Sequence, residues 1–133
     1  MKKEELINYW KNTSDKDFNT MINLYNSKDY HWSLFIGHLV IEKLLKAIYI
    51  KNSKENNQPP RTHDLLLIAS RAKLNPSENQ QDLLDKITTF NISARYPDYN
   101  HRFYKKCTSE YTAERIDEVK ELRVWLMTIL ENK

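Results

Sequence analysis

WSLFIGHLVIEKLLKAIYIK, residues 32–51, is the stretch that decides the fold of this chain. At about 100° per residue, its apolar side chains cover nearly every side of a helix. A helix that is apolar all round is typical of the centre of a bundle, where other helices cover it. The polar groups that remain form one narrow strip at spacings of four and three, made of His38, Glu42, Lys46 and Tyr49. Two interpretations stay open: the strip is the solvent-facing side of the helix, or it belongs to a functional cluster.

Further features of this helix concern its neighbours. Gly37 is the only glycine in the chain, and a glycine inside a helix costs about 1 kcal/mol relative to alanine. A close approach by another helix is one reason to keep it. The helix also carries more apolar surface than one side of a small bundle needs, and Val124 and Trp125 lie outside the apolar stripe of the last helix. Surplus apolar surface of this kind marks interfaces, so we predict a homodimer.

Length and composition indicate a single helical domain over residues 1–133. A chain of 133 residues can bury a core without a metal or a disulfide. The single cysteine, Cys107, excludes an intrachain disulfide and fits a reducing compartment, so we expect a soluble, cytoplasmic protein. The charged side chains of residues 32–51 argue against a membrane span, and no membrane association is expected. A net charge of +3 is too small to establish nucleic-acid binding.

The pattern along the chain predicts an all-α fold, a five-helix up-and-down bundle without strands. The first helix covers residues 3–26, and the short break at residues 27–29 makes an antiparallel hairpin with the central helix. After a loop that two prolines close, Thr62 caps a third helix with Asp64 in its first turn.

The second half of the chain supplies two more helices. The fourth begins with Asn75 as its cap and Pro76 at the first helical position. Pro97 ends it, and the tract of residues 94–106 is expected to be irregular, aromatic and basic. Thr112 caps the last helix. The core residues that we predict are Trp32, Leu39, Leu44, Ile48, Phe90 and Leu126.

Few residues suggest chemistry by spacing alone. No metal-ligand spacing joins the histidines, cysteine and carboxylates, and one glycine cannot build a phosphate loop, so no metal and no cofactor is predicted. Cys107 has no histidine at helical spacing, and we interpret it as structural. His63 lies at a helix start, where its ring bonds a neighbouring backbone group or serves a site. Arg95 follows the fourth helix, where it caps carbonyls, pairs with a buried acid such as Glu42, or grips a phosphate.

Three motifs in series resemble the HEPN domain family (higher eukaryote and prokaryote nucleotide-binding). They are Ile41-Glu42-Lys43-Leu44-Leu45-Lys46-Ala47, then Pro60-x-Thr62-His63-Asp64-Leu65, then Ala94-Arg95-Tyr96-Pro97. The resemblance covers residues 5–130 and implies a helical bundle that often dimerises and has a nucleotide- or RNA-related role. Such domains are commonly encoded beside a small nucleotidyltransferase, and the pair resembles a toxin–antitoxin system.

Some members of the family that this chain resembles are metal-independent ribonucleases with an arginine and a histidine a few residues apart. Arg95 and His101, with five residues between them, match that pattern. Cleavage of RNA without metal needs a base for the 2′-hydroxyl and a cation for the phosphorane, and these residue types suit both roles. Pro97 lies between the two, so we do not expect one helix to present both.

Two functions of different classes remain open. Because only one of them is catalytic, whether the chain is an enzyme also remains open. The first is a module that binds a nucleotide or RNA and acts with a nucleotidyltransferase partner. The second is a ribonuclease toxin with Arg95 and His101 as catalytic residues. For the first, we predict that one ligand site gathers several side chains, with Glu42 orienting Arg95. These side chains are Glu42, Lys46, His63, Arg95 and Tyr96.

Overall fold

A computed structural model describes residues 2–54 and 58–132, apart from the side chains of residues 97–100. Within these residues the chain forms six helices and no strand, which confirms the predicted all-α bundle. The helices are α1 (Lys3–Asn26), α2 (Tyr30–Asn52), α3 (Leu65–Arg71), α4 (Glu78–Arg95), α5 (Pro97–Lys106) and α6 (Ser109–Glu131). The prediction of five is one short because the tract expected to be irregular contains α5.

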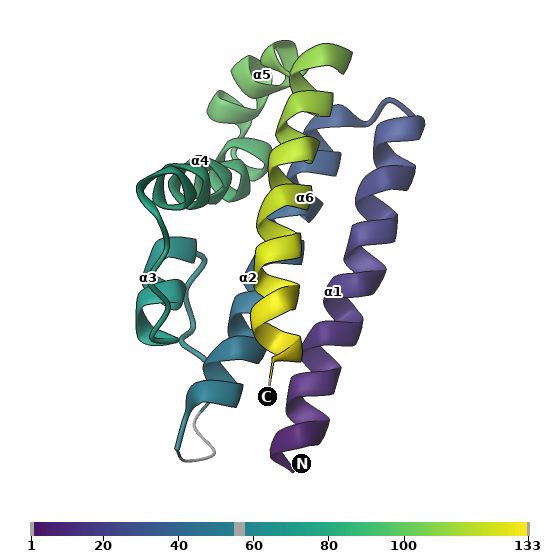
Figure 1. Ribbon diagram of the computed structural model, residues 1–133. Coiled ribbons are helices and arrows are strands. Elements are labelled where there is room, and N and C mark those ends of the chain that lie inside the picture. The colour runs from purple at the N-terminus through teal and green to yellow at the C-terminus, as the bar shows by residue number, and fades with distance from the viewer. Residues whose placement is uncertain (1, 55–57, 133) are drawn as a thin grey trace.

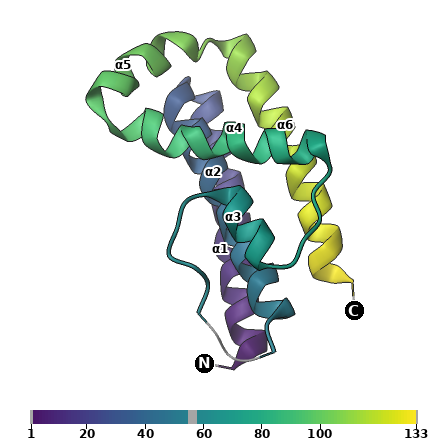
Figure 2. The same cartoon turned by 90° about the vertical axis from the view of Figure 1, so that its left-hand side faces the viewer.

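The three long helices α1, α2 and α6 run along the length of the bundle, with α1 and α2 as an antiparallel hairpin (Figure 1). The helix α4 lies across α2, with the short α3 beside it (Figure 2). Both termini lie at one end of the bundle, whereas α5 and the turn between α1 and α2 lie at the other end. None of the described helices is both long enough and apolar enough to cross a membrane.

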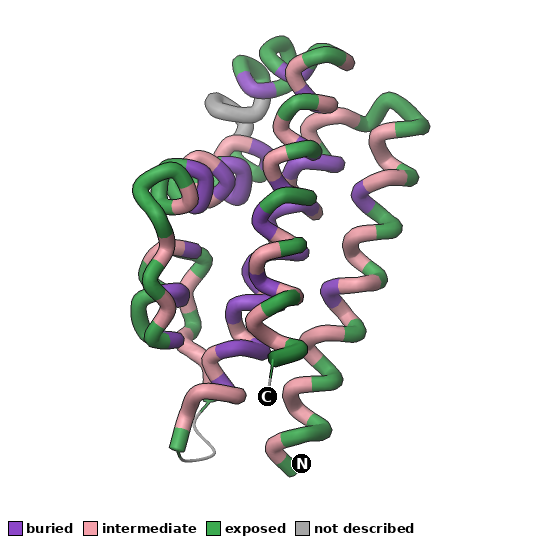
Figure 3. Tube along the Cα trace, in the orientation of Figure 1, coloured by how far each residue is buried: buried purple, intermediate pink, exposed green. Residues whose placement is uncertain are grey.

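The centre of the bundle is α2, as its all-round apolar sequence predicts. Twelve of its residues are buried, and Figure 3 shows buried positions along α2 and on the sides of α4 and α6 that face it. Four of the predicted core residues are buried, namely Leu44, Ile48, Phe90 and Leu126. Leu39 is only half-buried. The prediction was wrong for Trp32, which is 40% exposed because it lies in the first turn of α2, at the end of the bundle.

Gly37 lies where two helices approach α2 together. A Cβ atom built on Gly37 would lie 3.1 Å from Sδ of Met21 on α1 and 3.3 Å from Cγ2 of Val119 on α6. Both distances are shorter than ordinary van der Waals contact between carbon and its neighbours. The close helix approach proposed as a reason for this glycine is therefore confirmed.

The caps of α3 and α6 differ from the predicted ones. Asp64 caps α3, accepting from the backbone N–H of Leu67, while the hydroxyl of Thr62 accepts from the N–H of Asp64. Thr108 caps α6, and Thr112 lies fully buried one turn further on. In α3 and in α6, the N-cap is the residue whose side-chain oxygen accepts from a backbone N–H of the first turn, namely Asp64 and Thr108.

The start of α4 also lies two residues later than predicted. Ser77 accepts from the N–H of Gln80, and the Gln80 side chain accepts from the N–H of Ser77, forming a complete capping box. This arrangement satisfies two backbone donors at the start of the helix.

Pro97 ends α4 and also begins α5. Tyr96 is both the C-cap of α4 and the N-cap of α5, and Pro97 occupies the first position of α5. Proline suits that position because the N–H that it lacks would have no partner there. Phe103 is buried, with its ring centroid 5.6 Å from that of Phe90, so an apolar contact holds α5 on α4. The expectation of an irregular tract overlooked this second role of proline.

Candidate functional site

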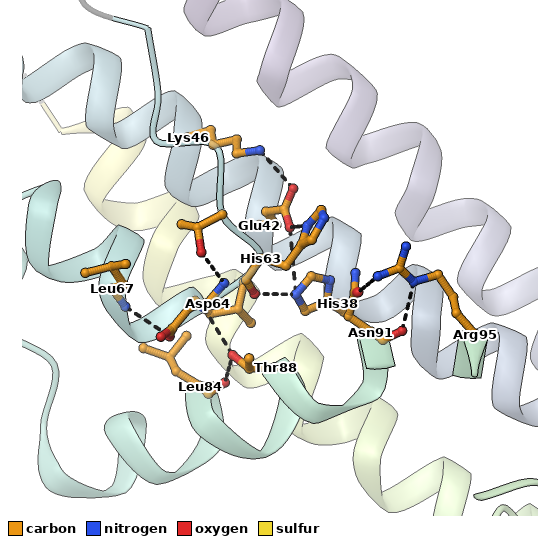
Figure 4. A network of polar contacts seen from close by, with 12 residues as sticks. His38, Glu42, Lys46, His63, Asp64, Leu67, Leu84, Thr88, Asn91 and Arg95 are labelled. Carbon is orange, nitrogen blue, oxygen red and sulfur yellow. Dashed lines mark hydrogen bonds and ion pairs between the residues drawn. The ribbon is translucent and has the colours of Figure 1, made fainter. Parts of the chain in front are cut away.

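Four side chains from α2 and from the segment before α3 form one polar cluster, which we call the acid–histidine cluster: His38, Glu42, Lys46 and His63 (Figure 4). The Nδ1 atom of His63 lies 2.7 Å from Oε1 of Glu42, and Nζ of Lys46 lies 2.9 Å from Oε2. Nε2 of His38 lies 3.8 Å from Oε1 of Glu42. The polar strip of the central helix is therefore a set of interacting groups.

The members of the cluster at its centre on α2 are buried, so the interpretation of the strip as a solvent-facing side is wrong. His38 is fully buried and Glu42 is 4% exposed. Burial alone would raise the pKa of Glu42, but the hydrogen bonds from His63 and Lys46 outweigh it, and the pKa is lowered. Glu42 is accordingly a carboxylate that accepts from both neighbours, and His63 uses Nδ1–H as the donor.

His38 holds the backbone of the segment that leads into α3. Its Nε2 lies 2.9 Å from the carbonyl oxygen of His63. Burial lowers the pKa of His38, against the opposing effects of that carbonyl and of Glu42. The neutral ring therefore donates from Nε2. Of the two interpretations of His63, a bond from its ring to a neighbouring backbone group is wrong: its ring bonds Glu42, and His38 orients the segment.

The same segment is tied to α4. The N–H of Leu65 donates to Oγ1 of Thr88, at 3.1 Å, and the Thr88 hydroxyl donates to the carbonyl of Leu84, at 2.8 Å (Figure 4). A buried backbone donor at the start of a helix needs such a partner. These bonds connect the acid–histidine cluster to α4, which carries Arg95.

Asn91 holds the guanidinium of Arg95. Nη2 of Arg95 donates to Oδ1 of Asn91 at 2.5 Å, and Nε donates to the Asn91 carbonyl at 3.2 Å. Asn91 is 3% exposed, so it is a fixed partner for an arginine that is itself exposed. The expectation that Glu42 orients Arg95 was wrong, because Asn91, one turn earlier on α4, does so.

The structure thus brings together three of the five predicted ligand residues. Glu42, Lys46 and His63 are in contact, whereas Arg95 bonds Asn91 instead, and its guanidinium lies 5.7 Å from the Tyr96 ring centroid. Sequence reasoning left out His38 and Asn91 as site residues. Both could have been found by spacing, since each lies one turn before the residue that it supports, Glu42 and Arg95 respectively.

Arg95 and His101 lie on consecutive helices. Arg95 is the last residue of α4, and His101 lies in the second turn of α5; both are exposed. Pro97 does keep them off a single continuous helix, as expected, yet each is presented by a helix of its own. In the part of the chain that the structure describes, no three histidine, cysteine or acidic side chains could hold a metal ion.

These features define a small all-helical domain with a buried acid–histidine cluster and a basic, aromatic end. The family model for the HEPN domain matches residues 7–130, nearly the whole chain. The protein therefore belongs to the HEPN family, and this membership indicates a nucleotide- or RNA-related module. Searches of curated proteins and of solved structures gave no significant match.

Proposed function

We propose that the protein binds a nucleotide or RNA in the cytoplasm and acts with a small nucleotidyltransferase in a pair similar to a toxin–antitoxin system. The observation that carries the proposal is an exposed surface at the end of α4 and along α5. We call it the α4–α5 surface, and its exposed residues are Arg95, Tyr96, His101, Arg102, Tyr104, Lys105 and Lys106. Membership of the HEPN family supports the same class of ligand.

The composition of this surface suits a phosphate backbone with unpaired bases. The sequence of α5 has three cations, Arg102, Lys105 and Lys106, against the single acid Asp98. Cations attract phosphates, and aromatic rings stack with bases of any sequence. Arg95 is held by Asn91, so less side-chain entropy is lost when its remaining N–H groups bind a phosphate.

The acid–histidine cluster has a supporting part in this proposal. Glu42 and Lys46 neutralise one another, so we assign them to holding His63 rather than to contact with the ligand. The side chain of His63 is 55% exposed, and with Nδ1 donating to Glu42 its other nitrogen, Nε2, is available to a ligand. We place Arg95 and Tyr96 in direct contact with the ligand.

We propose in addition that the protein is a homodimer. Val124 is 66% exposed on α6, and Ile92 is 49% exposed on α4. Contiguous apolar patches mark interfaces, and Val124 and Ile92 are the side chains from which we propose that this interface is built. The family resemblance favours the same arrangement.

The ribonuclease is the second candidate, and the exposure of both Arg95 and His101 on consecutive helices favours it. In that case His101 accepts the proton of the 2′-hydroxyl, and Arg95 stabilises the charge of the phosphorane. A dimer would supply two copies of this pair. Cleavage should then depend on both residues.

One experiment tests the proposal and separates the two candidates. The protein is expressed in cells, alone or with a nucleotidyltransferase encoded beside it, and growth and RNA integrity are followed. The purified protein is also titrated with single-stranded RNA in the absence of metal. We expect binding that Arg95→Ala weakens. The matched control is Arg71→Ala, because Arg71 is also the exposed last residue of a helix. Absence of binding refutes the proposal, and cleavage that His101→Ala abolishes identifies the ribonuclease.

A further inference from the structure

A hollow at the end of the bundle that carries α5 shares Tyr104 and Lys105 with the α4–α5 surface and has no residue in common with the acid–histidine cluster. It has a volume of about 370 Å³ and is lined by Lys28, Tyr30, His31, Tyr104, Lys105 and Cys107. These residues come from the turn between α1 and α2, the start of α2 and the end of α5, which lie together at one end of the bundle (Figure 1). The volume lies within the usual range for sites that bind small molecules, about 300–1,000 Å³.

Aromatic rings form one part of the lining. The ring of His31 lies 5.3 Å from the ring of Tyr104, edge to face, and 4.9 Å from the ring of Trp32. Partial burial lowers the pKa of His31, against the opposing charge of Asp29, and so disfavours the charged form of the ring. The ring of Tyr104 is 62% exposed and offers a face to a ligand. Such a platform suits the stacking of a planar base.

Two cations form another part of the lining. Lys28 and Lys105 are exposed and come from two different parts of the chain, the α1–α2 turn and the last turn of α5. Lys28 has a φ of 67°, and its N–H donates to the carbonyl of Tyr25. The turn that places this lysine is therefore a defined structure. Two ammonium groups beside aromatic rings suit a phosphate attached to a base.

The hollow is continuous with the α4–α5 surface through α5 itself. Tyr104 and Lys105 lie three and four residues after His101, so the three side chains share one flank of the helix. Arg102 and Lys106 share another flank, beside a separate and smaller hollow with Ser93 and Phe103. A nucleotide held between Tyr104 and Lys28 would therefore lie on the flank that carries His101.

We infer that this hollow binds one nucleotide, either free or as the phosphorylated end of an RNA strand. The base stacks on the face of Tyr104, His31 supports that ring from an edge-to-face position, and the phosphate lies between Lys28 and Lys105. The inference rests on the proposed function and gives it a location for a single nucleotide. Its volume admits one nucleotide and not a length of strand, which distinguishes it from the open α4–α5 surface.

The test is calorimetric titration of the purified full chain with AMP, with adenosine, and with a six-nucleotide RNA with or without a 5′-phosphate. We expect AMP to bind and adenosine to bind more weakly. Tyr104→Ala should weaken AMP binding about fivefold or more, as loss of a stacked base does. Tyr104→Phe should restore it, because the ring face remains. Lys28→Gln should weaken binding of AMP and remove any preference for the phosphorylated strand.

Matched controls are available in the chain. Lys73 is exposed, follows α3 and has a φ of 65°, so Lys73→Gln changes the same residue type in the same backbone conformation as Lys28→Gln. Tyr9 is 52% exposed on α1, so Tyr9→Ala is the control for Tyr104→Ala. Neither control should change binding. Circular dichroism of each variant checks that it remains helical.

The outcomes separate this inference from the proposed function. If the phosphorylated RNA binds more tightly than AMP, the natural ligand is the end of an RNA strand. If AMP binds more tightly, the natural ligand is a free nucleotide. Both results support the inference. If RNA binds and Arg95→Ala weakens it, while Tyr104→Ala and Lys28→Gln bind AMP and RNA like the wild type, the hollow is not the site and the proposed function stands. If neither RNA nor AMP binds, both are refuted.

Discussion

Replacement of Glu42 by glutamine is the most direct test of the acid–histidine cluster. Each carboxylate oxygen of Glu42 faces its own donor, Oε1 facing His63 Nδ1 and Oε2 facing Lys46 Nζ. Glutamine keeps the shape but has one oxygen and one amide nitrogen, and that nitrogen is a donor. In either orientation of the amide, one donor therefore faces another donor and loses its partner.

We expect Glu42→Gln to lower the free energy of unfolding by about 2–3 kcal/mol. Removal of one partner from a fully buried ion pair costs about 3–5 kcal/mol. Glu42 is 4% exposed, but the side chains of Lys46 and His63 are 12% and 55% exposed, so both donors can turn toward water. That movement lowers the cost to about that of a lost hydrogen bond to a charged group, 1.5–3 kcal/mol.

Urea unfolding at pH 7, followed by far-ultraviolet circular dichroism, measures the change. The control is Glu114→Gln, because the side chain of Glu114 is 70% exposed beside Arg115; it should change stability by less than about 0.5 kcal/mol. Lys46→Met should cost less in the Glu42→Gln background than in the wild type, since the unpaired donor is then removed. The reasoning is refuted if Glu42→Gln matches the control, or if Lys46→Met costs the same in both backgrounds.

Three further predictions concern stability and are read by the same unfolding measurement. Gly37→Val should destabilise by about 2 kcal/mol, because its side chain overlaps Met21 and Val119; wild-type stability would contradict the packing. Stability should fall as the pH drops below about 6.5, because the unfolded chain protonates His38 while the lowered pKa in the fold resists protonation. His38→Gln should flatten that slope, and an unchanged slope would exclude His38 as its cause. Lys28→Gly should stabilise by up to about 1 kcal/mol, since glycine adopts a φ of 67° without strain; a loss of stability would contradict that geometry.

Most of the fold could be predicted, because the spacing of apolar residues shows which side of each helix is buried. The first helix was predicted at its observed bounds, Lys3–Asn26, and the central helix began only two residues late. Periodicity does not report the position of a residue along the bundle axis, and for that reason Trp32 was assigned to the core although it lies at an open end. Caps were misplaced because several neighbouring residues offer a suitable oxygen and only the geometry selects one.

The candidate site could be predicted only in part, because spacing along a helix shows which side chains share a face but not which segment covers that face. The pair of Glu42 and Lys46 follows from their spacing on one helix. The contact of His63 with Glu42 joins positions 21 residues apart, and it depends on the path of the segment before α3. Arg95 was expected to pair with Glu42, a buried acid. The acceptor that it uses is instead the side-chain amide of Asn91, one turn earlier on the same helix.

The acid–histidine cluster and Arg95 are nonetheless connected, through the backbone between them. Glu42 holds the ring of His63, and His38 holds its carbonyl. Two residues further on, the N–H of Leu65 donates to Thr88 on α4. The buried polar groups of α2 are therefore linked to α4 by a chain of bonds, in addition to the apolar packing of α4 on α2.

Thr88, which receives this bond, lies on the same helix as Arg95 of the α4–α5 surface. Arg95 lies seven residues, about two turns, after Thr88 on the same helix, and Asn91 between them fixes the guanidinium. A buried ion pair seldom stabilises a protein more than apolar residues of the same volume would. Apolar residues at Glu42 and His38 could fill the same space but could not bind the ring and carbonyl of His63, so we interpret the cluster as holding the segment before α3. That segment in turn bonds α4 at Thr88, about two turns before Arg95, while the guanidinium itself is held by Asn91.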